Sequence, residues 1–231
     1  MLEPGGRVAM VSGAARGIGR HVAERLLAAG FQVSAGLRDR RGLPDHPNLL
    51  VHRYDAESLA SAEAWTTATI ARFGRLDGLV NAAGINPGFA VNDPDETALD
   101  QLWAINVKAP LRLIRLALPY LKACGQGRVI NIASLSGKRV RNANIGYAMS
   151  KFALVALTHG VRHDGWDHGV RATALCPGFV ATDMTTRVTR VARSEMTDPA
   201  DLAALVETLL SLPNTAAIAE LLVNCQHEDA L

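Results

Sequence analysis

Short apolar runs alternate with longer stretches of helical periodicity along almost the whole sequence, and this alternation limits what the chain can fold into. Runs typical of strands occur at residues 7–11, 31–36, 48–53, 76–81, 128–132, 170–175 and 221–224. Helical spacing is seen from Ile18 to Gly30 and over residues 57–73, 97–123, 144–163 and 199–212. Elements in this order predict a doubly wound α/β fold, with a parallel sheet covered by helices on both faces.

The composition indicates one domain over residues 1–231. A length of 231 residues, with 48% hydrophobic and 20% charged residues, is ordinary for a soluble globular chain. A net charge of +2 and 5% aromatic residues do not favour nucleic-acid binding. No apolar run is long enough for a membrane span, and the first residues do not resemble a signal peptide.

The cysteines indicate a reducing compartment and no metal site. Cys124, Cys176 and Cys225 are far apart and odd in number, so we expect no disulfide framework and a cytoplasmic location. No cysteine or histidine spacing is typical of zinc.

A glycine-rich loop follows the first strand. Gly13, Gly17 and Gly19 form a GxxxGxG pattern between that strand and the first helix. Glycines here permit a tight turn and close approach of a pyrophosphate to the N-terminus of the helix. The alternative is a plain strand-to-helix turn, because three glycines alone are weak evidence.

Residues at the end of the second strand favour NADP(H) over NAD(H). Leu37 stands where a carboxylate would bind the ribose hydroxyls of NAD, and Arg38 follows it. Arg16, in the glycine loop, is a second candidate for the 2′-phosphate, since guanidinium groups match phosphate oxygens. Asp39 can weaken such a phosphate site or accept a ribose hydrogen bond. The alternative is a solvated basic turn.

Six motifs occur in the order found in one enzyme family. They are Ser12–Gly19, Asn81–Gly84, Asn106, Ser134, the YxxxK pattern from Tyr147 to Lys151, and Pro177-Gly178 with Thr182. On these the chain resembles the short-chain dehydrogenase/reductases over about residues 7–184, with Ser12 in place of threonine and Ala82 in place of the second asparagine.

The resemblance implies a Rossmann-type fold, NAD(P) and a set of site residues. The implied catalytic residues are Asn106, Ser134, Tyr147 and Lys151. The implied cofactor-binding residues are Gly13, Ala15, Arg16, Gly17, Ile18, Gly19, Arg38, Asp55, Ala56, Asn81, Ala82, Gly84, Tyr147, Lys151, Pro177, Gly178, Val180 and Thr182. It also implies a homodimer or homotetramer, although the chain lacks the glycine-rich C-terminal segment of many relatives.

The chemistry of the YxxxK pattern can be argued independently. Tyr147 and Lys151 share one helix face, and we expect the ammonium to lower the pKa of the phenol so that it can exchange a proton with a substrate. Ser134, just past a strand end, can hold the same substrate oxygen. The alternative is a surface Tyr and Lys on an ordinary helix.

Asn106 lies four residues before Pro110 in the long helical stretch. Because proline has no N–H, an α-helix would leave the carbonyl of Asn106 without its donor. We expect that carbonyl to hold a water beside Lys151 and to support a proton relay. The alternative is a kinked helix with a polar asparagine.

Two groups of basic residues are expected near the substrate. A lid at residues 182–198 contains Arg187, Arg190 and Arg193, which share a face if that segment is helical. The loop before Tyr147 adds Lys138, Arg139 and Arg141. Together they suggest an anionic or carrier-bound substrate. Solvated surface cations are the alternative.

We therefore expect an NADP(H)-dependent oxidoreductase that interconverts a carbonyl and an alcohol, with a 3-oxoacyl thioester as one candidate substrate. The alternatives are an NAD-dependent dehydrogenase of a small hydroxy compound and a nucleotide-sensing regulator on the same fold. The four filled catalytic positions favour an enzyme over the regulator.

Overall fold

Seven parallel strands form one sheet in the centre of the molecule. The computed structural model describes residues 1–39, 43 and 45–228. The strands are β1 Val8–Ser12, β2 Gln32–Leu37, β3 Leu49–Arg53, β4 Gly78–Asn81, β5 Arg128–Ile132, β6 Arg171–Pro177 and β7 Glu220–Val223. They pair in the order β3-β2-β1-β4-β5-β6-β7, every pair parallel. The predicted doubly wound fold is confirmed.

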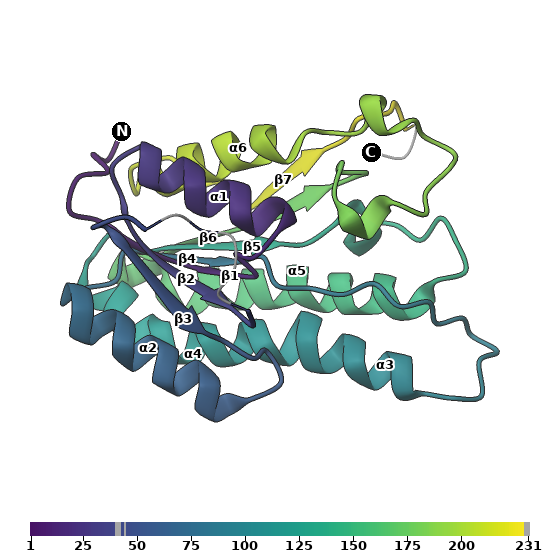
Figure 1. Cartoon of the computed structure of the whole chain (residues 1–231), viewed down its shortest axis with the longest axis horizontal. Helices are drawn as coiled ribbons and strands as arrows, with labels where there is room; N and C mark the ends of the chain where they lie inside the picture. The colour runs from purple at the N-terminus through teal and green to yellow at the C-terminus, as the bar shows by residue number, and fades with distance from the viewer. Residues whose placement is uncertain (40–42, 44, 229–231) are drawn as a thin grey trace.

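Helices cover both faces of the sheet (Figure 1). One face carries α1 Gly17–Ala28 and α6 Pro199–Ser211, and the other carries α2 Leu59–Phe73, α4 Ala109–Ala123 and α5 Ile145–Gly165. Since both faces are buried, β1, β4 and β5 have no exposed position, which explains why they appear as continuous apolar runs.

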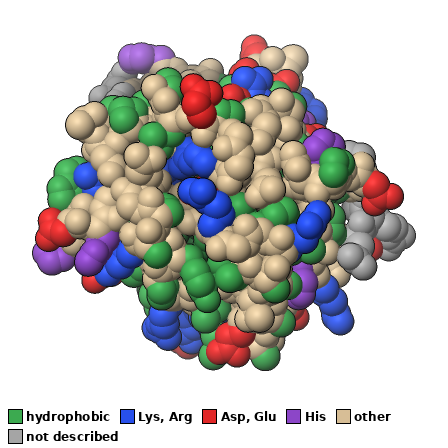
Figure 2. Space-filling model, turned by 90° about the vertical axis from the view of Figure 1, so that its left-hand side faces the viewer, with side chains coloured by type: hydrophobic (Ala, Val, Ile, Leu, Met, Phe, Trp, Pro, Cys, Tyr) green, Lys and Arg blue, Asp and Glu red, His purple; other side chains and the backbone are tan. Residues whose placement is uncertain are grey.

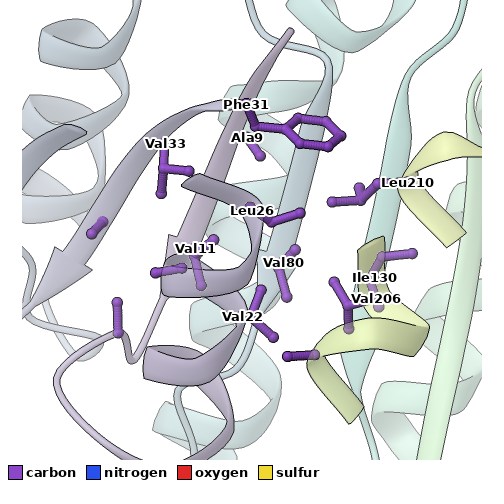
Figure 3. Close-up of a cluster of buried hydrophobic side chains, with 14 of the residues drawn as sticks. Ala9, Val11, Val22, Leu26, Phe31, Val33, Val80, Ile130, Val206 and Leu210 are labelled. Carbon is purple, nitrogen blue, oxygen red and sulfur yellow. The ribbon is translucent and has the colours of Figure 1, made fainter. Parts of the chain in front are cut away.

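The sheet is packed between two apolar cores. In the first, Leu26 of α1 and Leu210 of α6 meet Ile130 of β5 (Figure 3). In the second, Trp65 of α2 and Leu113 of α4 lie on the opposite side of the same strands. Both cores are close to completely buried, so they fix the helices on the sheet.

The direction of winding changes between β1 and β4. The chain moves from β1 to β2 and β3 on one side, and from β4 to β5, β6 and β7 on the other. Ser12 and Asn81 are paired at the carboxyl ends of these two strands. In open α/β sheets, ligands bind at this switch point.

The predicted helix over residues 97–123 is wrong in its middle. The structure has α3 Thr97–Leu102, then a π-helical segment Trp103–Lys108, then α4. Here the N–H of Ala109 donates to the carbonyl of Ala104, five residues back. The wider turn precedes Pro110, which has no N–H to continue an α-helical ladder, and it buries Asn106.

Basic side chains gather at the opposite end of the sheet from the switch point (Figure 2). At the start of β1 and β5, Arg7 donates to the carbonyl of Leu210 at 2.7 Å and Arg128 donates to the carbonyl of Leu212 at 2.5 Å. Burial lowers the pKa of Arg128 to about 10. Both arginines therefore satisfy carbonyls at the C-terminal end of α6.

No helix in the described part of the chain has the length and apolar character needed to cross a membrane.

Candidate active site

A cleft with a volume of about 580 Å³ lies at the carboxyl ends of the strands. The predicted cofactor residues that line it are Gly13, Ala15, Arg16, Gly17, Ile18, Gly19, Arg38, Asp55, Ala56, Ala82, Gly84 and Thr182. These come from the glycine loop, the ends of β2, β3 and β4, and the lid segment at residues 182–198. The structure therefore brings together residues that are up to 169 positions apart.

Close backbone packing shapes the glycine loop. Gly13 has a φ of +70°, and a Cβ there would lie 2.7 Å from the amide nitrogen of Ala83. A Cβ on Gly19 would lie 2.5 Å from the carbonyl oxygen of Gly13. The Ser12 hydroxyl accepts hydrogen bonds from the amides of Ala82 and Ala83 at 3.1 and 3.2 Å. The loop is thus fixed against the end of β4.

The N-terminus of α1 faces this cleft and suits an anion. Gly17, Ile18 and Gly19 form the first turn of α1 and line the cleft. The helix has no side-chain cap and no acidic residue in its first turn. Uncapped N–H groups and the positive end of the helix dipole favour phosphate. The volume, the glycines and this helix end together fit a dinucleotide.

Arg38, Asp39 and Asp55 line one end of the cleft, at the ends of β2 and β3. Arg16 lies in the glycine loop, and its guanidinium is 3.4 Å from the carboxylate of Asp183 in the lid segment, with both side chains largely exposed. This pair links the two sides of the cleft. The role of Asp183 was not predicted, because an exposed acidic residue in a polar loop carries no signal of its partner.

Tyr147, Ser134 and Lys151 meet beyond the inner end of the cleft. The Ser134 and Tyr147 side chains are hydrogen-bonded. The ammonium of Lys151 lies 5.6 Å from the centre of the Tyr147 ring and donates to the carbonyl of Ile132 at 2.8 Å. A Cβ on Gly84, which lines the cleft, would lie 3.9 Å from that ammonium, so the cleft leads to these side chains.

The expected lowering of the tyrosine pKa is wrong for this structure. Burial raises the pKa of Tyr147 to about 12, opposed in part by the hydrogen bond with Ser134. Burial also lowers the pKa of Lys151 to about 8. Lys151 lies over the ring and donates to a backbone carbonyl, so desolvation outweighs its effect on the phenol. Tyr147 is therefore protonated at neutral pH.

Asn106 connects the cleft wall to α5 through its side chain. Its Oδ1 accepts from the amide of Ile85 at 2.9 Å, and its Nδ2 donates to the carbonyl of Ile85 and to the hydroxyl of Ser150, both at 3.0 Å. Ser150 in turn donates to the carbonyl of Tyr147 at 2.8 Å. The sequence indicated a role only for the carbonyl of Asn106. The contact with Ser150 was not predicted, and the expected water stays a prediction.

The remaining predicted cofactor residues lie outside the cleft lining. Asn81 is buried, and its amide donates to the side chain of Asn131 at 2.8 Å. The carbonyl of Pro177 accepts from the hydroxyl of Ser134 at 3.5 Å, and Gly178 follows it. Val180 is bridged to Thr197 at the base of the lid segment.

The lid segment contains two short 3-10 turns, Asp183–Thr185 and Arg193–Glu195, with no helix between them. Its three arginines therefore share no helix face. Arg193 donates to the carbonyls of Ala181 and Thr182 at 3.1 Å, and Arg190 lies 4.7 Å from the centre of the Phe179 ring. Arg187 lines the cleft.

The second basic group is also engaged within the chain. Lys138 pairs with Glu220 at 2.6 Å, and both Arg139 and Arg141 pair with Glu228. Of the two basic groups expected near the substrate, this one is therefore neutralised by carboxylates from the C-terminal part of the chain. Among the described residues, only Arg187 of the six has neither an ion pair nor a hydrogen bond nor a ring contact.

Several cleft residues were not predicted. They are Gly36, Tyr54, Glu57, Ile85, Asn86, Ile105, Asp183, Met184 and Thr186, of which the last three lie in the segment predicted as a lid. Tyr54 lies just past the end of β3, a position that could have indicated it. Ile105 lies in the π-helical segment, whose shape was not foreseen.

A family model for short chain dehydrogenases matches residues 7–192. The chain belongs to this family. Members of this family use NAD(H) or NADP(H).

One curated relative is the agropine synthesis reductase of Rhizobium rhizogenes, 43% identical over 227 residues. The match covers 96% of this chain, which spans about half (53%) of that reductase. Among solved structures, levodione reductase has a TM-score of 0.86 at 27% identity, covering 95% of this chain and 96% of the other. A Brucella melitensis 3-ketoacyl-(acyl-carrier-protein) reductase with NADH has a TM-score of 0.87 at 24% identity, covering 95% and 96%, and shows the fold.

Proposed function

We propose that this short-chain dehydrogenase reduces a ketone or aldehyde to an alcohol, with NADP(H) preferred over NAD(H). The observation that carries the proposal is the group formed by Tyr147, Ser134 and Lys151 just beyond the inner end of a glycine-lined cleft. The relatives named above are reductases. Reduction suits a tyrosine that is protonated at neutral pH, because the product alcohol needs a proton.

In this mechanism the nicotinamide, when bound, supplies the hydride. Tyr147 donates its phenolic proton to the carbonyl oxygen of the substrate. The hydroxyl of Ser134 donates a hydrogen bond to the same oxygen and stabilises its developing negative charge. Lys151, held over the face of the tyrosine ring, places a positive charge near the phenolate that forms. The side chain of Asn106 links α5 to the cleft wall, because it donates to both Ser150 and Ile85.

Arg38 and Arg16 support the preference for NADP(H). Arg38 lines the cleft at the end of β2, next to Leu37, and Arg16 lines it from the glycine loop. Arg38→Asp should weaken NADPH binding by about 10- to 100-fold, because a charge-assisted contact to phosphate is replaced by repulsion. Binding of NADH should change little or improve. Titration of both cofactors by fluorescence tests this, and equal losses for both would contradict the preference.

A substrate screen tests the reaction itself. Oxidation of NADPH and of NADH is followed with 3-oxoacyl thioesters, keto acids, aldehydes and cyclic ketones, alongside Tyr147→Phe as the blank. Turnover that disappears in the variant supports the proposal. Tight NADPH binding with no turnover of any class would favour a nucleotide-sensing regulator. Faster turnover of a small hydroxy compound with NAD⁺ would favour the NAD-dependent alternative.

We also propose that residues 182–198 act as a lid over the substrate, with Arg187 as its contact to an anionic or carrier-bound substrate. We further propose that the enzyme is cytoplasmic and works as a homodimer or homotetramer. Exposed Leu111 and Tyr120 on α4, and Met149 and Phe152 on α5, would support such an assembly. Light scattering coupled to size-exclusion chromatography measures the oligomeric state.

A further inference from the structure

The segment at residues 223–228, which we name the C-terminal clasp, contacts both sides of Ser134. It begins at the end of the edge strand β7. One side of Ser134 is the turn at Pro177-Gly178, and the other is the loop that leads through Arg139 and Arg141 to α5. The mechanism proposed above assigns no role to this segment.

The first part of the clasp is attached to the Gly178 turn. The amide of Gly178 donates to the carbonyl of Val223 at 2.8 Å. A Cβ on Gly178 would lie only 2.7 Å from Oδ1 of Asn224, so the side chain of Asn224 packs closely against the backbone of Gly178. The residue before this turn, Pro177, accepts from the hydroxyl of Ser134 at 3.5 Å.

The last part of the clasp is attached to the loop after Ser134. Arg139 donates to both carboxylate oxygens of Glu228, at 2.8 and 2.6 Å, and Arg141 lies 2.9 Å from the same carboxylate. Asn224 also hydrogen-bonds to Glu228. Only 8% of the Glu228 side chain and 17% of the Arg139 side chain is exposed. Arg139 and Glu228 therefore form a bidentate, mostly buried ion pair, which fixes the relative orientation of the two side chains.

These contacts close a ring. The amide of Arg139 donates to the carbonyl of Leu135 at 3.2 Å, and Leu135 directly follows Ser134. The side chain of Leu135 would lie 3.3 Å from a Cβ on Gly178. A path therefore runs from Ser134 through Gly178, Asn224 and Glu228 to Arg139 and back.

We propose that Glu228 is a positioning residue. Its ion pairs close this ring of contacts and thereby hold Ser134 and the adjoining wall of the substrate site in place. Without its carboxylate, two arginines face each other with no counter-ion, and the loop after Ser134 should detach from the clasp. Another interpretation is that the arginine pair is a substrate-anion site filled by Glu228. The ring favours the clasp, because the same segment also fixes Gly178 through contacts that no substrate anion could make.

Amide hydrogen exchange on the full chain tests the clasp without using activity. In Glu228→Gln, which keeps size but loses charge, the amides of residues 135–141 should exchange at least about 10-fold faster. Glu228→Asp, which keeps the charge, should restore part of the protection. Glu207→Gln, which breaks the Arg25–Glu207 pair between α1 and α6, is the matched control and should leave this loop unchanged. Unchanged exchange in Glu228→Gln would overturn the proposal.

Kinetics form a second test, which rests on the proposed function. Glu228→Gln should lower kcat/KM for the carbonyl substrate by about 10-fold or more, while the Kd of NADPH stays within about twofold, since small displacements of reacting groups are costly. Tighter binding of carboxylate-bearing substrates by Glu228→Gln would overturn the clasp in favour of an anion site. If the wild-type chain turns over no substrate, the proposed function fails, and hydrogen exchange still decides on the clasp.

Discussion

Burial controls the protonation of the two central side chains of the site. It moves the pKa of Tyr147 upward and that of Lys151 downward, since each group loses water that stabilises its charged form. A tyrosine that holds its proton is suited to donate it to a carbonyl. Keeping Lys151 charged in a buried position lowers the stability of the fold, so selection for stability alone would not favour a lysine there.

Removing the phenol should stop proton transfer and leave the fold intact. Tyr147→Phe deletes the hydroxyl that hydrogen-bonds to Ser134. We expect kcat for carbonyl reduction to fall by about 10²- to 10⁴-fold, the usual contribution of a positioned acid. The Kd of NADPH, measured by fluorescence, should change by less than about threefold. A variant that keeps wild-type kcat would exclude Tyr147 as the proton donor.

Replacing the buried ammonium should stabilise the protein while removing activity. The pKa of Lys151 is about 8 in the folded state and near 10.5 when unfolded. The unfolded state therefore binds more protons between pH 8 and 10.5, so this group's contribution to stability rises with pH across that window. Lys151→Met should raise the free energy of unfolding by about 2–3 kcal/mol at pH 7, and the gain should shrink toward pH 10.

Urea titration at several pH values measures this difference. A gain that does not depend on pH would mean that the lysine is not desolvated as the structure indicates.

At the scale of the element, the start of α5 is where local and tertiary contacts coincide. The Oδ1 of Asn144 accepts from the amide of Tyr147 at 3.4 Å, as the N-cap of α5, and from the amide of Phe89 at 3.1 Å. Its Nδ2 donates to Asn86, which lines the cleft, at 2.8 Å. One side chain thus caps the helix that carries Tyr147 and holds the opposite wall.

Asn144→Ala should cost about 1 kcal/mol of stability through the lost cap, and also lower kcat/KM by about 10-fold through the shifted cleft wall. Asp198→Ala is the matched control, because Asp198 caps α6 by accepting from Ala200 at 2.8 Å, at the far end of the lid segment from the cleft residues. Chemical unfolding and steady-state kinetics should separate the two variants. Equal kinetics in both would limit Asn144 to helix capping.

The π-helical segment is a second case at this scale. Pro110 does interrupt the ladder of hydrogen bonds, as its missing N–H requires, but the helix responds by widening over residues 103–108. The sequence locates the disturbance. The form of the disturbance, a π-helical turn, depends on the burial of Asn106. The side chain of Asn106 hydrogen-bonds to Ile85 and Ser150, which are distant from it in the sequence.

At the scale of the whole molecule, the two ends of the sheet have different roles. The carboxyl ends carry the cleft, and the amino ends carry buried charges that hold the layers together. Asp77 accepts from the amide of Val8 at 2.8 Å, bonds Arg75 through both carboxylate oxygens, and lies 3.9 Å from Arg7. Arg7 in turn reaches the end of α6.

Asp77→Asn should lower the free energy of unfolding by about 3–5 kcal/mol, since it leaves the buried Arg7 without its counter-ion. Glu24→Gln, which removes the exposed Arg20–Glu24 pair on α1, should cost less than about 1 kcal/mol. Guanidinium unfolding measures both. If kcat and KM per folded molecule fell in Asp77→Asn, the two ends of the sheet would not be independent.

Much of the fold and part of the site were predictable from local patterns. Strand and helix periodicity depends on which face of an element is buried, so residues 7–81 could be divided into elements before their contacts were known. The spacing of Tyr147 and Lys151 places them on one helix face, whatever the rest of the chain does.

The basic residues show the limit of such patterns. Lys138, Arg139 and Arg141 look like an open cluster in the sequence, but their partners Glu220 and Glu228 lie more than 80 positions away. A charge in a sequence says nothing about its counter-ion, because ion pairs depend on the meeting of distant segments. The same reason explains why Asp183 and Ser150 were missed.

The sequence by itself therefore determined a doubly wound sheet, a glycine loop at its switch point, and four polar residues in the order of one family. Only the tertiary structure decided the protonation of Tyr147, the shape of the helix at Asn106 and the availability of each cation. Periodicity and motif spacing are local properties of the chain. Desolvation and charge pairing depend on every segment that packs around a group, and these exist only once the chain has folded.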